Sequence, residues 1–290
     1  MSSYFFKIGN SHPLVQTLRE FLYSRFYLKT PGVQVCSVVF DSSMQSMLAD
    51  YRKFHGLDRQ RTIFSFDSLL DEATYEQIGS EMSDDEIAMA SVHDSDIKKL
   101  LYGNPCSDWA ATGPVIAKDK FIGWNQPGIK HNCFDYCKEQ LRVVGRSMKS
   151  SWWGDKKMSA HIYQLYLTEN VAGMKKGAQP RQFINGVKYL KSALKAKTPV
   201  AAGVEDGGGS PNADKVTDHF VVIVGMGSDG LGNYFHFYDN ATGDKDEGTS
   251  AKNRLYVNCD DYMIKGTADN AYVRITEYKS YLVTQIRETN

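Results

Sequence analysis

The chain has 290 residues, of which 42% are hydrophobic, enough to bury one large core or two smaller ones. Lys and Arg together number 34, as do Asp and Glu, so the formal net charge is zero and no basic excess indicates a nucleic-acid partner. No apolar run approaches the roughly 18 residues of a membrane-spanning helix. We therefore expect a protein with no nucleic-acid partner and no membrane span.

Three helices are predicted near the N-terminus. Pro13 is a start signal for the first helix, which carries apolar residues at helical spacing. Asp41 is placed to cap the second helix, and Gly56 is a suitable residue to end it. The third covers residues 71–82. These signals predict a small helical domain over residues 1–83.

The rest of the chain, residues 84–290, is predicted to place helices first and strands second. Helical periodicity is seen in residues 84–102, after Cys133, around Ile162 to Tyr166, and after Pro180. From Pro199 onward the period changes to two, with strands expected near 199–204, 219–225, 233–239, 253–258, 271–277 and 280–286. Helices followed by an antiparallel sheet predict an α+β fold.

Cys133 and His219 have the sequence settings of a thiol nucleophile and its base. Cys133 follows a loop rich in Gly and Pro and opens an amphipathic helix, where unpaired backbone N–H groups and the helix dipole stabilise a thiolate. His219 directly precedes the apolar run Phe220–Val224, which is typical of a strand buried on both faces. The alternatives are a structural thiol and a buried strand-edge histidine.

The third member of such a site must come from the next strand, which ends Tyr238-Asp239-Asn240. Strand alternation points Asp239 and Asn240 to opposite faces, so only one of them can reach His219. A carboxylate holds the imidazole tautomer and favours the imidazolium. We predict Asp239 in this role and keep Asn240 as the alternative.

Other uses of the cysteines and glycines are less favoured. Five cysteines, an odd number, form a poor disulfide framework. The spacing of His131, Cys133 and Cys137 permits a zinc site, but no second ligand pair has metal-site spacing, and Cys137 is better explained as a buried apolar residue. Gly225–Gly230 matches a nucleotide-binding pattern, yet an aromatic strand follows where a helix is required, so a β-hairpin is predicted. No metal or other cofactor is expected.

The first domain resembles peptidoglycan-binding repeat domains. The resemblance covers residues 12–81 and rests on Leu14-Val15-Gln16-Thr17-Leu18, on Val39-Phe40-Asp41-Ser42-Ser43 and on Phe54-His55-Gly56-Leu57. Met44 stands where the family pattern has Thr, and the turn before it lacks the usual Gly. The resemblance implies a module that binds peptidoglycan.

The second domain resembles papain-like enzymes, and within them the NlpC-like bacterial cell-wall amidases and endopeptidases. The resemblance rests on the helix that begins Asn132-Cys133, on Asp218-His219 with its apolar strand, and on the strand ending Asp239-Asn240. It implies a papain-like cysteine peptidase, a hydrolase that cleaves peptidoglycan stem peptides. The Cys133 backbone N–H would serve the oxyanion. Gln126 is one position further from the Cys than papain's oxyanion Gln, so we predict its participation only as an additional donor.

Some enzymes of this kind are antibacterial effectors of type VI secretion, which act in the periplasm and pair with an immunity protein. The start, Met1 to Lys7, lacks the basic and apolar stretches of a Sec signal peptide. We therefore expect synthesis in the cytoplasm and export by a dedicated secretion system, with peptidoglycan and an immunity protein as partners. A deamidase or transglutaminase-like toxin that modifies a protein could use the same triad. A non-catalytic wall-binding protein is the third reading.

Overall fold

The computed structural model consists of two compact units, Met1–Asn104 and Pro105–Asn290. It describes residues 9–26, 39–57, 72–90, 101, 104–129, 132–150, 160–168, 176–207 and 217–290. Among these residues, none of the helices is long and apolar enough to cross a membrane.

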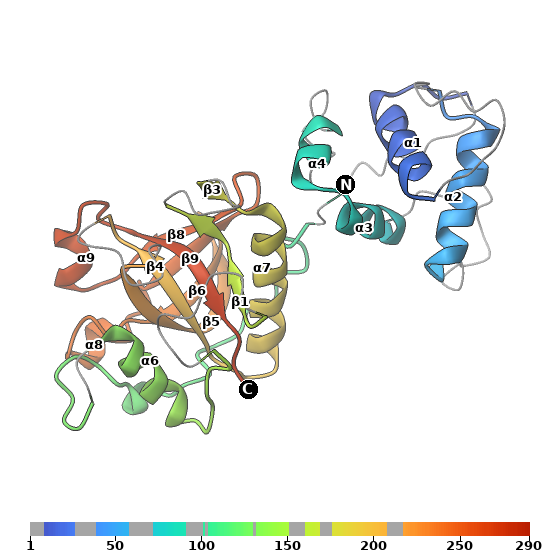
Figure 1. Ribbon diagram of the computed structural model, residues 1–290. Helices are drawn as coiled ribbons and strands as arrows, with labels where there is room; N and C mark the ends of the chain where they lie inside the picture. The colour runs from blue at the N-terminus through green and yellow to red at the C-terminus, as the bar shows by residue number, and fades with distance from the viewer. Residues whose placement is uncertain are drawn as a thin grey trace. The chain divides into compact units, whose positions relative to one another are not determined.

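The first unit contains the three predicted helices and a fourth. They are α1 (Pro13–Phe26), α2 (Ser42–Phe54), α3 (Glu72–Glu81) and α4 (Asp84–Ala90) (Figure 1). Asp41 caps α2 as predicted, since its side chain accepts a hydrogen bond from the Met44 backbone N–H. Gly56 follows the helix with a φ of +68°, a left-handed conformation that glycine adopts without steric cost.

The first unit ends at Asn104, later than the boundary at residue 83 that the sequence suggested. The reason is that α4 packs against α1 and buries Ile87 in the same core. Leu101 is also buried, and its backbone approaches Gly79 so closely that a Cβ at that glycine would collide with the Leu101 carbonyl. The intervening part of the predicted 84–102 helix lies outside the described residues.

The second unit is built around an antiparallel sheet with the strand order β1-β9-β4-β5-β6-β7-β8. Because β9 also pairs with β8, the six strands from β9 to β8 close into a barrel. The strands are β1 (Ile162–Gln164), β4 (Val200–Glu205), β5 (His219–Asp229), β6 (Gly232–Tyr238), β7 (Arg254–Asn258), β8 (Met263–Thr267) and β9 (Tyr281–Arg287). A two-stranded sheet, β2 (Tyr166–Leu167) with β3 (Gly177–Ala178), accompanies it.

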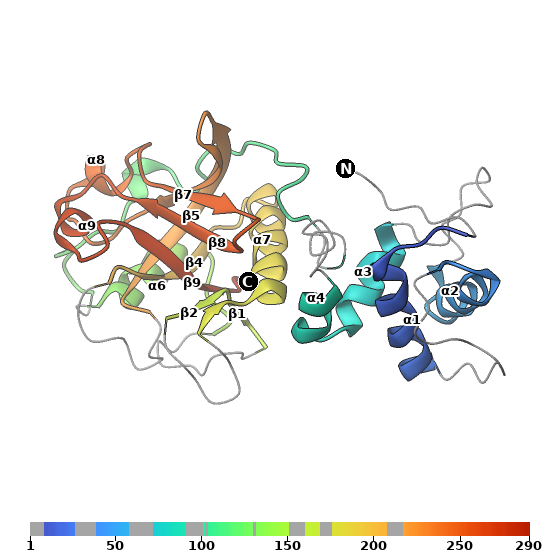
Figure 2. The same cartoon turned by 90° about the horizontal axis from the view of Figure 1, so that it is seen from above.

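Helices cover the barrel on two sides, which both views show (Figures 1 and 2). On one side lies α7 (Pro180–Lys195), in contact with β1, β4 and β5. Toward the other lie α6 (Cys133–Arg142), α8 (Lys245–Gly248) and α9 (Ala271–Ile275). The apolar face of α6 packs on alternate β5 residues, with Phe134 and Phe220 ring centroids 4.9 Å apart. This packing anchors the start of α6 beside the start of β5.

The strand predictions near 199–204, 219–225, 233–239, 253–258 and 280–286 are confirmed by β4, β5, β6, β7 and β9. Two predicted elements are wrong. Residues 271–277 contain the helix α9, because the Asn270 side chain caps it by accepting from the Val273 N–H. The stretch around Ile162 to Tyr166, expected to be helical, lies in β1 and β2 instead, and β1 gains hydrogen-bonded pairing with β9.

The expectation against disulfides is also wrong, because Cys106 and Cys259 are joined with an S–S distance of 1.97 Å. The bond ties the beginning of the second unit to the residue after β7. Cys133 and Cys137 are free thiols, and Cys36 lies outside the described residues. Disulfides persist mainly in oxidising environments.

Removing the disulfide should destabilise the second unit. The bond closes a sequence separation of 153 residues, and closing so long a loop restricts the unfolded chain. We expect the Cys106→Ser/Cys259→Ser double variant to lose about 2–5 kcal/mol of unfolding free energy. Denaturant unfolding of the variant and of the wild type, each with and without reductant, measures this. A double variant as stable as the oxidised wild type would contradict the expectation.

Candidate active site

Cys133 occupies the first position of α6, and Asn132 caps the helix. The Asn132 Oδ1 accepts the Asp135 backbone N–H at 2.8 Å, and its Nδ2 donates to the Asp135 carboxylate at 2.7 Å. First-turn N–H groups have no partners within their own helix, so they remain directed at whatever lies beyond the helix start. Cys133 is partly exposed, whereas Cys137, one turn later, is fully buried. Of these two thiols, Cys133 is the accessible one.

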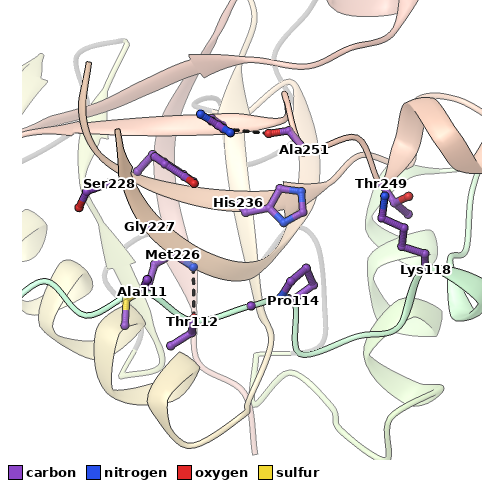
Figure 3. A pocket seen from close by; sticks show the side chains of 13 residues that line it. Ala111, Thr112, Pro114, Lys118, Met226, Gly227, Ser228, His236, Thr249 and Ala251 are labelled. Atoms are coloured by element: carbon purple, nitrogen blue, oxygen red, sulfur yellow. Dashed lines mark hydrogen bonds between the residues drawn. The ribbon is translucent and has the colours of Figure 1, made fainter. Parts of the chain in front are cut away.

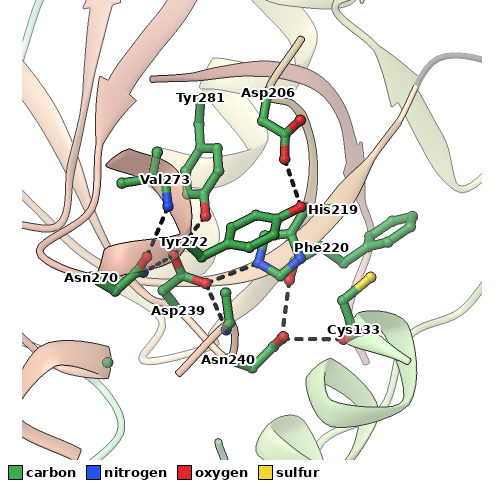
Figure 4. A network of polar contacts seen from close by, with 12 residues as sticks. Cys133, Asp206, His219, Phe220, Asp239, Asn240, Asn270, Tyr272, Val273 and Tyr281 are labelled. Atoms are coloured by element: carbon green, nitrogen blue, oxygen red, sulfur yellow. Dashed lines mark hydrogen bonds and ion pairs between the residues drawn. The ribbon is translucent and has the colours of Figure 1, made fainter. Parts of the chain in front are cut away.

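His219 opens β5 and lies between Cys133 and Asp239 (Figure 4). Its backbone is held in the sheet opposite Val204 of β4. The ring is 5% exposed, and its Nε2 donates a hydrogen bond to the Asp239 Oδ1 at 2.9 Å. Because Asp239 occupies Nε2, the Nδ1 atom is the nitrogen left to exchange a proton with a thiol or a substrate.

Asp239 follows the last residue of β6 and is completely buried. Besides His219, its Oδ1 accepts the Ala241 N–H at 3.0 Å. Its Oδ2 accepts the Asn270 Nδ2 at 2.6 Å and the Tyr281 hydroxyl at 2.9 Å. Four donors from separate segments fix the position of one carboxylate, so its orientation toward the imidazole is determined by the surrounding structure.

Asn240 points elsewhere, as strand alternation requires. Its Nδ2 lies 3.1 Å from the Cys133 carbonyl oxygen, 3.0 Å from the Phe220 carbonyl oxygen and 3.3 Å from the Cys137 sulfur. It therefore connects the start of α6 to β5, and none of these bonds goes to the His219 ring. Of the two side chains, Asp239 is the one hydrogen-bonded to His219.

The charges of His219 and Asp239 stabilise each other. Burial by itself disfavours the imidazolium, but the Asp239 charge and hydrogen bond outweigh it, and an interaction with Cys133 adds to them, so the pKa of His219 rises to about 10. Burial likewise disfavours the Asp239 carboxylate, yet His219 and the other donors lower the pKa of Asp239 below its ordinary value. The pair is therefore an imidazolium and a carboxylate at neutral pH.

The pKa values predict opposite titrations for two histidines. Burial, together with the charges of Lys118 and Arg254, lowers the pKa of His236 below its ordinary value, whereas that of His219 is raised to about 10. In histidine-labelled protein followed by NMR, His236 should lose its proton below pH 6.5 and His219 well above it. Since His219 is protonated more readily folded than unfolded, its stabilising contribution is complete below about pH 6.5 and is lost as pH rises toward 10. A His219 titration near 6.5 would contradict the ion pair.

Gln126 lies exposed in the loop before α6, where its backbone N–H donates to the Gly123 carbonyl. Its role as an oxyanion donor stays a prediction. The neighbouring Trp124 is partly exposed, and its ring centroid is 5.6 Å from that of Tyr136 on α6. Loop residues 124–126 thus lie next to the helix that carries Cys133. His131 lies outside the described residues, and among those described no three His, Cys, Asp or Glu side chains are arranged to hold a metal.

Three residues near His219 were missed by the sequence reasoning. Asn270 and Tyr281 bind Asp239, as described above, and Tyr272 on α9 lies with its ring centroid 5.7 Å from that of His219. The Tyr272 hydroxyl donates to the buried Asp206 at 2.8 Å. Asn270 before a short apolar segment is a helix-cap signal that could have revealed α9.

Comparisons with protein-family models, with curated proteins and with solved structures found no match to this chain.

Proposed function

We propose that the protein is a cysteine amidase or endopeptidase that cleaves an amide bond in peptidoglycan stem peptides. The observation that carries the chemistry is the arrangement of an accessible Cys133 at a helix start, a buried His219 and an Asp239 hydrogen-bonded to its Nε2 at 2.9 Å. Thiol, imidazole and carboxylate in this order are the parts of an activated nucleophile.

In the proposed reaction, the Cys133 thiolate attacks the amide carbonyl carbon and forms a C–S bond. The Cys133 backbone N–H at the start of α6 stabilises the resulting oxyanion. The His219 imidazolium then gives its proton to the leaving amine as the C–N bond breaks, which leaves a thioester. Neutral His219 next takes a proton from water, and the hydroxide releases the carboxylic acid and restores the thiolate. Asp239 holds the ring and compensates its charge throughout.

The substrate is proposed from sequence resemblance and from the compartment. Both units resemble proteins that act on peptidoglycan, one as a binding module and the other as a papain-like cell-wall hydrolase. Disulfides such as Cys106–Cys259 persist outside the reducing cytosol. Peptidoglycan also lies outside the cytosol. Export through a type VI system and neutralisation by an immunity protein are further parts of this proposal.

Digestion of purified sacculi tests the substrate. Wild-type protein and the Cys133→Ala variant are incubated with the same sacculi, and soluble and insoluble fragments are analysed by mass spectrometry. We expect the wild type alone to generate new amine ends within stem peptides. If no such ends form, while a protein substrate is deamidated or cross-linked by the wild type, the toxin reading replaces this one.

Deleting residues 1–104 should separate wall binding from catalysis. The second unit forms its own compact core, so it should retain its fold and its activity on a small soluble stem peptide. Binding to insoluble sacculi, measured by co-sedimentation, should be much weaker than for the full chain. The inactive Cys133→Ala full-length protein, which still carries the first unit, is the binding control. Equal sedimentation of truncated and full-length protein would remove the targeting role.

A further inference from the structure

A cavity of about 430 Å³ lies in the second unit, beside the face of β6 that carries His236 (Figure 3). His236 lines the cavity. Its neighbours Phe235 and Phe237 are buried and point to the other face of β6. By strand alternation, the Asp239 side chain points to the same face as these two rings. None of the residues that form the Cys133–His219–Asp239 site lines the cavity. Its volume is in the range of small-molecule sites.

The cavity exists because residues 111–115 lie along β5 as an additional extended segment. The Thr112 N–H donates to the Met226 carbonyl at 2.8 Å, and the Val115 N–H donates to the Val224 carbonyl at 2.8 Å. Gly113 lines the space, and a Cβ added there would meet no atom within 4 Å. The cavity is therefore bounded by the backbone of residues 111–115 and of β5, which hydrogen bonds hold together.

Three basic side chains from different elements line the cavity. Lys118 comes from the short 3₁₀ helix η2 (Lys118–Lys120), His236 from β6 and Arg254 from β7. The charge of Arg254 is already compensated, because its Nη1 pairs with Asp229 and its guanidinium lies 4.4 Å from the Tyr234 ring centroid. Lys118 is solvent-exposed and forms no ion pair with an acidic side chain among the described residues, so its ammonium group is available to an anionic ligand.

His236 supplies an acceptor rather than a second cation. Its Nε2 donates to the Ser250 carbonyl at 2.9 Å, which leaves the Nδ1 atom as the acceptor. Burial and the neighbouring charges lower its pKa, so the ring is neutral at pH 7. Pro114, Met226 and Ala251 contribute apolar lining. A matching ligand has one carboxylate, one N–H donor close to it and a small apolar body.

We propose that this cavity binds the carboxyl end of a short acylated peptide, with Lys118 meeting the carboxylate and His236 accepting the adjacent amide N–H. An N-acylated amino acid is the smallest molecule with these three groups. That the natural ligand is the free carboxyl end of a peptidoglycan stem peptide, held apart from the bond being cut, rests on the proposed function. The binding of an N-acylated amino acid in this cavity does not rest on the proposed function.

Calorimetric titration of the full chain with N-acetyl-D-alanine tests the proposal, with N-acetyl-D-alaninamide as the uncharged counterpart. We expect the acid to bind and the amide to bind about ten-fold or more weakly, since a charge-assisted hydrogen bond is lost. Lys118→Gln should weaken binding of the acid to a similar extent. Lys120→Gln, on the same 3₁₀ helix but outside the cavity lining, should leave it unchanged.

Alkylation of Cys133 before titration distinguishes this cavity from the catalytic site, and binding should persist. The proposal is overturned if millimolar acid gives no binding, if acid and amide bind equally, if Lys118→Gln binds like the wild type, or if alkylation abolishes binding.

N-acetyl-L-alanine distinguishes the sources, because D-residues occur in stem peptides and not in ribosomal chains. Preference for the L-form would contradict a D-residue at the end of a stem peptide as the natural ligand. Sacculi left uncut by a protein that still binds the acid would refute the proposed function alone.

Discussion

Asp239→Asn is expected to reduce turnover by about three to four orders of magnitude, with little change in substrate affinity. The substitution removes the negative charge that supports the His219 imidazolium. It also allows the amide to present a donor to Nε2 and so to select the wrong tautomer. Steady-state kinetics on a soluble stem peptide measure the loss. Because two oxygens of Asp239 accept four donors, the variant should also be less stable, so kinetics belong well below its unfolding temperature.

Asn240→Ala is the matched control on the adjacent residue. Its side chain bridges the carbonyls of Cys133 and Phe220, so its loss should cost about 1–3 kcal/mol of stability and leave turnover largely intact. If instead Asp239→Asn were nearly silent and Asn240→Ala eliminated turnover, the site would follow papain's Cys-His-Asn order. Asp239 would then be a structural residue at the end of β6.

Cys133→Ala is expected to abolish turnover while the fold survives, because it removes the nucleophile from a partly exposed position at the start of α6. Circular dichroism and thermal unfolding establish that the variant is folded, and product analysis establishes the loss. Iodoacetamide should modify Cys133 in the folded protein and inactivate it, because this thiol is accessible to the reagent.

Cys137→Ala is the control within the same helix. Cys137 is fully buried and packs against the β5 face, so the variant should lose about 1 kcal/mol of stability through missing contacts and retain most of its activity. Equal loss of activity in both variants would contradict a single nucleophile and would favour a site that uses both sulfurs.

The parts of the site that sequence could predict are those with local signals. Cys133 follows an N-cap residue and begins an amphipathic helix, and His219 precedes a run of apolar residues that the structure buries throughout. Strand alternation predicts that Asp239 and Asn240 point to opposite faces. Each of these inferences used only residues within a few positions of the one predicted.

The parts that sequence missed depend on contacts between distant segments. Ala271–Ile275 has the aromatic and β-branched composition of a strand, but the Asn270 cap makes it a helix. Met263–Thr267 is short and contains Gly266, and it becomes β8 only by pairing with both β7 and β9. The disulfide joins cysteines 153 residues apart, which no local pattern reveals.

Mass spectrometry of acid-quenched reactions detects the covalent acyl intermediate that we propose Cys133 forms on an amide substrate. Wild-type protein is mixed with a stem peptide, quenched over a time course and digested for peptide mapping. We expect the peptide containing Cys133 to gain the mass of the acyl portion and this adduct to decay as free acid accumulates. Cys133→Ala should form neither adduct nor product. Product formation by Cys133→Ala at the wild-type rate would contradict this mechanism.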